Sequence, residues 1–146
     1  IEVQYGGWDM HNDVFGNLET KAQVLDQGLS SLLKDLDARG LLSETMVVVA
    51  SEFGRSPEVK AGRVGRDHHP SSFSALMAGG GIKEGYVHGK SDERAHYVEE
   101  DGVSMQDLNA TIAHAMGIST SKIIYSPSGR PFKIAHDGKV IRQILS

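Results

Sequence analysis

The stretch Thr45-Met-Val-Val-Val-Ala50 decides the fold, because it is a continuous apolar run of mostly β-branched residues. Such a run is typical of a strand that is buried on both faces of a parallel sheet. Residues 1–5 alternate apolar and polar side chains before Gly6-Gly7 and predict a second, shorter strand. A helix predicted between these two strands would complete a βαβ unit, whose crossover is expected to be right-handed.

The predicted helix runs from about Leu18 to Arg39, and Gly40 ends it as a C′ glycine. Its apolar residues recur at steps of three and four: Leu18, Ala22, Leu25, Leu29, Leu32, Leu33 and Leu36. A second helix begins at the capping box Ser104-Met-Gln-Asp107 and continues to Gly117. A third strand is predicted from Phe73 to Ala78, before a run of three glycines.

Composition narrows the class of protein. A chain of 146 residues and 15.8 kDa is the length of one domain. The net charge of −4, with scattered basic residues, excludes the basic footprint of a nucleic-acid-binding protein. No apolar run reaches the roughly 20 residues of a membrane span. The chain has no cysteine, so any bound metal must be held by His and carboxylate side chains.

Three polar clusters stand where the chain is expected to leave its strands: residues 6–11, 51–57 and 65–70. Asp9 and His11 in the first cluster are two residues apart, which places both side chains on one side of an extended segment. They offer a metal one carboxylate oxygen and one imidazole nitrogen. The alternative is an ordinary turn aspartate beside a surface histidine.

The second cluster, Ser-Glu-Phe-Gly-Arg-Ser-Pro, follows the buried strand directly. Glu52 is a candidate metal ligand or general base, or the solvated first residue of a loop. Arg55 is a candidate catalytic residue, because a planar guanidinium binds pairs of phosphate or sulfate oxygens, and it could equally neutralise Glu52.

The third cluster contains Asp67, His68 and His69 before Pro70 and has the highest density of metal-ligand side chains in the chain. Proline biases His69 toward an extended backbone, so the two imidazoles should point in opposite directions. We expect one of them to bind the metal and the other to support the site or the substrate.

These motifs, in this order, resemble one known family. The segments Gly-Gly-Trp-Asp-x-His, Val-Val-Val-x-x-Glu-Phe-Gly-Arg-Ser-Pro, Gly-Arg-Asp-His-x-Pro and Ala-Gly-Gly-Gly-Ile-Lys-x-Gly are similar to those of the bacterial domain of unknown function 1501. That family is related to alkaline phosphatases and sulfatases. The likeness extends over nearly the whole chain.

The resemblance implies a three-layer α/β/α fold with a mostly parallel sheet, of which residues 1–146 would be the C-terminal part. It assigns Asp9 and His11 to a first metal-binding pair and His68 or His69 to a late metal-binding position. By side-chain type, Glu52 and Asp67 are further candidate ligands. Phe53 stands where phosphatases and sulfatases of that clan usually have histidine.

The function implied is metal-dependent hydrolysis of phosphate or sulfate esters, with zinc, manganese, calcium or iron as the divalent metal. The alternative is a non-catalytic binding or structural protein with a degenerate metal site. Expected partners are a small-molecule or polysaccharide ester and either a second copy of the chain or a missing N-terminal half, with no nucleic acid. The resemblance also implies a periplasmic or exported protein.

Overall fold

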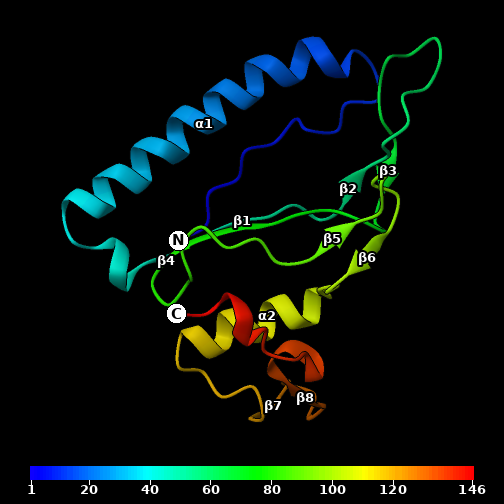
Figure 1. Cartoon of the computed structure of the whole chain (residues 1–146). Coiled ribbons are helices and arrows are strands. Elements are labelled where there is room, and N and C mark those ends of the chain that lie inside the picture. Colours follow the sequence, from blue (N-terminus) through cyan, green and yellow to red (C-terminus); the bar gives the residue numbers. More distant parts are fainter.

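The computed structural model describes residues 1–146 as two α-helices and eight short strands (Figure 1). The helices are α1 (Val14–Ala38) and α2 (Met105–Ala115). The strands are β1 (Met46–Val49), β2 (Gly54–Arg55), β3 (His68–His69), β4 (Leu76–Gly79), β5 (Lys90–Ser91), β6 (Val98–Glu100), β7 (Ile123–Tyr125) and β8 (Pro131–Lys133). Single 3₁₀ turns occupy Leu42–Glu44, Ile134–Asp137 and Arg142–Ile144.

The strands form four separate antiparallel pairs, so the predicted three-layer fold with a mostly parallel sheet is wrong. The pairs are β1 with β4, β2 with β3, β5 with β6, and β7 with β8. Residues 1–5, expected to be the first parallel strand, form no strand and make no backbone hydrogen bond. No βαβ unit is therefore completed around α1.

The strand predicted from the apolar run is present as β1, but its environment differs from the one expected. All four of its residues are half-buried rather than buried, and only one of its edges is paired. Its partner β4 runs antiparallel, with Met46 opposite Gly79 and Val49 opposite Leu76. A run of β-branched residues indicates a strand, but it does not identify the partner strand or its direction.

The core lies at α2 and the C-terminal residues that cross it. The buried side chains there are Leu108, Ala110, Thr111, Ala113 and Ile141. Thr111 Oγ1 accepts a hydrogen bond from the Ile141 backbone at 2.9 Å, and Asp107 Oδ1 accepts one from the Lys139 backbone at 2.6 Å. The predicted capping box between Ser104 and Asp107 is present, so α2 and its start are confirmed.

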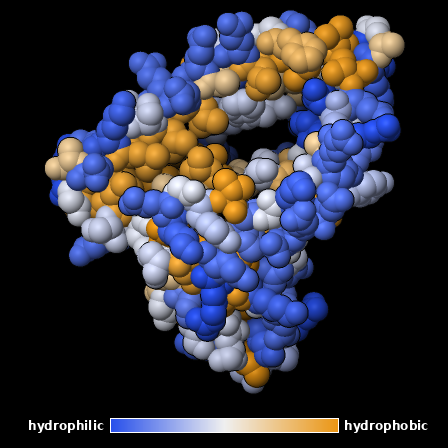
Figure 2. Space-filling view, in the orientation of Figure 1, coloured by the Kyte–Doolittle hydropathy of each residue, from blue (hydrophilic) through white to orange (hydrophobic).

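Helix α1 begins four residues earlier than predicted and ends as expected, with Gly40 at φ 68°. Among the other elements it packs mainly against the 3₁₀ turn that follows it. In Figure 2 an open gap separates the apolar side of α1 from the rest of the molecule. Leu18 and Leu32 remain 40% and 47% exposed, so this face of the helix lacks a partner within the chain. Neither helix has the length and apolar character needed to cross a membrane.

Candidate metal centre

The β2–β3 pair determines which side chains of the second and third clusters face the site. Arg55 lies opposite His68, and Gly54 lies opposite His69. Residues directly opposite each other in an antiparallel pair project to the same face. Arg55 and His68 therefore share one face, and His69 lies on the other.

The first cluster is brought to the same place by close backbone contact. The Arg66 N–H donates to the Met10 carbonyl at 3.1 Å, and the Val14 N–H donates to the Val64 carbonyl at 2.9 Å. Gly65 makes this approach feasible, because a Cβ atom there would lie 1.9 Å from the His11 carbonyl oxygen. Gly65 is therefore needed for the close backbone contact between the first and third clusters.

Asp9, His11 and His68 converge so that one ligand atom from each lies within 4.8 Å of the others. The Nε2 atoms of His11 and His68 are each 2.9 Å from Asp9 Oδ1. The three side chains remain between 38% and 61% exposed, so the cluster is open to solvent and to a ligand. Of the six residues predicted as metal ligands, these three form a compact group.

Asp67 lies beside the cluster and contacts His11 from its other side. Its Oδ1 atom is 3.3 Å from His11 Nδ1, and its other oxygen pairs with the Lys60 ammonium. Lys60, helped by His11, lowers the pKa of Asp67. The carboxylate therefore orients the imidazole, as the outer partners of metal-bound histidines commonly do. Nothing in the spacing of Lys60 indicated this contact.

The neighbours of Asp9 favour its ionised form over its protonated form. Hydrogen bonds from His68 and from Arg55, whose Nη1 atom is 2.7 Å from Asp9 Oδ1, lower the pKa of Asp9 to about 2. The carboxylate is therefore ionised throughout the physiological range. An ionised carboxylate is the form that binds a metal.

Phe53 supports the cluster from one side. Its ring centre lies 4.3 Å from that of His68 with a tilt of 34°, and the Arg55 guanidinium carbon is 5.6 Å from the Phe53 ring. The ring thus restrains both the imidazole and the guanidinium that reach Asp9. The sequence identified Phe53 only as a departure from the clan, and not as a packing partner of His68.

Two other predicted site residues lie outside the cluster. His69 Nε2 is 2.6 Å from the His96 carbonyl oxygen, on the opposite face from His68, which confirms that the two imidazoles point apart. Glu52 is exposed and lines a neighbouring cavity, with no hydrogen bond or ion pair to Asp9, His11 or His68.

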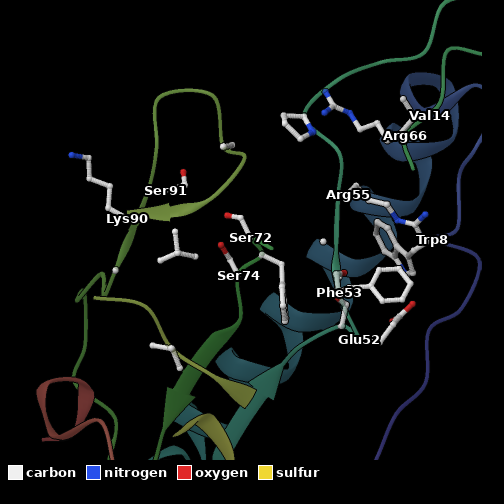
Figure 3. A pocket seen from close by; sticks show the side chains of 18 of the residues that line it. Trp8, Val14, Glu52, Phe53, Arg55, Arg66, Ser72, Ser74, Lys90 and Ser91 are labelled. Atoms are coloured by element: carbon white, nitrogen blue, oxygen red, sulfur yellow. Dashed lines mark hydrogen bonds between the residues drawn. The ribbon is translucent and has the colours of Figure 1, made fainter. Parts of the chain in front are cut away.

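A cavity of about 770 Å³ adjoins the cluster. Figure 3 shows Trp8, Phe53 and Arg55 together on one of its walls, with Ser72 and Ser74 across the space from them. Arg66 also lines it and donates to the Ser56 carbonyl at 2.6 Å. The cavity therefore combines aromatic surface, hydroxyl groups and charged groups of both signs next to the candidate ligands.

Comparisons with curated proteins and with solved structures found no match. The family described as "Protein of unknown function (DUF1501)" matches residues 1–145. The match covers all three polar clusters and both helices. The chain therefore belongs to the DUF1501 family.

Proposed function

We propose that these residues supply the metal-binding part of the site in a metal-dependent hydrolase of phosphate or sulfate esters. The carrying observation is His11, which faces a carboxylate through each ring nitrogen. When Nδ1 donates to Asp67, a neutral ring has only a lone pair at Nε2, which faces Asp9 Oδ1 at 2.9 Å. In that tautomer, a metal ion coordinated by both atoms would relieve the contact between their lone pairs.

The donor set suits a divalent metal. Two imidazoles and one carboxylate are a common ligand set for zinc, with a fourth position open to water or substrate, and also for non-haem iron. Calcium takes oxygen ligands, so His11 and His68 favour zinc, iron or manganese over it. When bound, such a metal would stabilise negative charge on the transferred phosphate or sulfate group.

The attacking group of the proposed reaction lies outside these residues. Ser51 Oγ donates to the Phe53 carbonyl and Ser56 Oγ accepts from the Glu58 backbone, so both hydroxyls serve local turns. Neither contacts a base, which an activated nucleophile requires. We therefore propose that this chain is the C-terminal part of a larger site, related through its motifs to the alkaline phosphatase and sulfatase clan.

A non-catalytic metal-binding or structural protein is the second candidate. Phe53 favours it, because an apolar ring packs against His68 at the position where the clan usually has a further imidazole. With three ligands, the site has fewer protein contacts to a metal than a closed structural site, which usually has four. This count favours the hydrolase.

Hydrolysis assays separate the two candidates. We expect the intact protein, containing these residues and the proposed nucleophile, to release 4-nitrophenol from 4-nitrophenyl phosphate or 4-nitrophenyl sulfate when it is loaded with metal. Asp9→Ala should abolish turnover, whereas Asp26→Ala, an exposed aspartate on α1, should not. The 146-residue chain alone should show no turnover. A metal-loaded intact protein that is inactive on both esters would favour the non-catalytic candidate.

A further inference from the structure

Arg55 both donates a hydrogen bond to the cluster and lines the cavity. Its Nη1 atom lies 2.7 Å from Asp9 Oδ1, and the side chain is 23% exposed. It also lines the 770 Å³ cavity beside Trp8 and Phe53, as Figure 3 shows. In the structure as it stands, Asp9 neutralises the guanidinium.

Asp9 Oδ1 has more neighbours than it has acceptor sites. Arg55, His11 and His68 each place a nitrogen within 2.9 Å of this one oxygen, which offers about two lone-pair directions. A cation held by Asp9, His11 and His68 would occupy one of these directions and would repel the guanidinium. Metal binding should therefore weaken the Asp9–Arg55 pair, because it places a second positive charge on the same oxygen.

The cavity has room for an oxyanion that the guanidinium could bind once Asp9 releases it. Ser72 and Ser74 line the cavity with hydroxyl groups, and Arg66 adds positive charge. Glu52 and Asp101 add carboxylates, while the Lys90 ammonium pairs with Glu100. A planar guanidinium binds two oxygens of a phosphate or sulfate group through parallel hydrogen bonds. The surroundings of Arg55 thus suit a tetrahedral oxyanion once Asp9 is engaged elsewhere.

We propose that Arg55 is an oxyanion-binding residue that Asp9 restrains until a metal binds, so that inorganic phosphate or sulfate and the divalent metal bind with positive coupling. This inference rests on the proposed function and names the feature of the site that binds the substrate's charged group. Because coupling between two sites is reciprocal, phosphate should also tighten metal binding by the same factor. A factor of about 5–150 is the usual range for such coupling.

The decisive measurement is phosphate binding to the metal-free chain by equilibrium dialysis. Asp9→Ala removes the restraint without any metal, so it should bind inorganic phosphate at least about fivefold more tightly than the metal-free wild type. The double variant Asp9→Ala/Arg55→Gln should lose this gain. Asp101→Asn is the control for loss of charge, because Asp101 lines the same cavity and has no ion pair with Arg55. Asp9→Asn serves as a second variant if Asp9→Ala does not fold.

The outcomes distinguish this inference from the proposed function. An equal gain in Asp101→Asn, or a gain in Asp9→Ala that survives without Arg55, would show a general charge effect and overturn the inference. A wild-type chain that binds zinc, but whose phosphate affinity is unchanged by zinc, would also overturn it while leaving the metal centre intact. Absence of zinc binding would refute the proposed function, and the metal-free variants would still test the release of Arg55.

Discussion

At the scale of single residues, the site depends on which nitrogen of His11 is free. Asp67 Oδ1, 3.3 Å from Nδ1, directs the other nitrogen toward Asp9. We expect Asp67→Asn to weaken zinc binding about 10–100-fold, the usual effect of losing such an outer carboxylate. His11→Ala, which removes a ligand, should weaken it further. Competitive zinc titration would measure both, and an Asp67→Asn variant with unchanged affinity would remove Asp67 from the centre.

The residue scale also shows what the sequence could predict of the site. Asp9, His11 and His68 were predictable as candidates, because their side-chain types and positions after expected strands indicate metal chemistry. The choice of His68 over His69 was not, because it depends on the register that places Arg55 opposite His68. That register is a contact between segments, and no local pattern specifies it.

At the scale of elements, α2 is the best-defined unit, and its start can be tested. Asp107 accepts hydrogen bonds from the Lys139 backbone and from Ser104, and these lower its pKa. Asp107→Ala should lower the free energy of unfolding by about 1–2 kcal/mol, since it removes half of the capping box and a partner of the C-terminal segment. Urea denaturation at pH 7 would measure this loss.

The same variant has a pH dependence whose sign follows from the lowered pKa of Asp107. The stabilisation due to the Asp107 charge is fully present above the pKa of an aspartate in the unfolded chain, about 3.9. It is lost as the pH falls through the lower pKa of the folded state. The difference in unfolding free energy between wild type and Asp107→Ala should therefore shrink below about pH 4. A difference that grows on acidification would contradict the assigned hydrogen bonds.

The helices were predicted more accurately than the strands for a physical reason. Helical periodicity, the Ser104–Asp107 box and Gly40 act within a few residues of each other, so the sequence shows them directly. Strand pairing instead joins β1 to β4, and both the second and the third clusters lie between these two strands in the sequence. The parallel partner expected at residues 1–5 required a contact across α1, and the run at 45–50 contained no information about it.

At the scale of the whole molecule, the chain exposes more surface than its mass accounts for. Its accessible surface is 10584 Å², whereas a compact monomer of 15.8 kDa has about 7,300 Å², an excess of about 3,300 Å². The apolar face of α1 contributes to it, with Leu18 and Leu32 exposed. An exposed apolar helix face is typical of an interface.

We therefore expect the chain to self-associate, with α1 in the contact. Analytical ultracentrifugation should give a mass above 15.8 kDa. Leu32→Glu, on the apolar face, should shift the distribution toward the monomer, because it adds a charge to the buried surface. Gln27→Glu, on the polar face, should not. A wild-type chain that stays monomeric at all concentrations would contradict this expectation.

The proposed chemistry of the whole molecule depends on Asp9, His11 and His68 holding a metal ion. The direct measurement is the metal content of zinc-loaded, desalted protein by mass spectrometry. We predict about one zinc per wild-type chain, retained in His69→Ala and His114→Ala and lost in Asp9→Ala and His68→Ala, because His69 and His114 lie outside the cluster. Equal metal content in all five proteins would contradict the assignment.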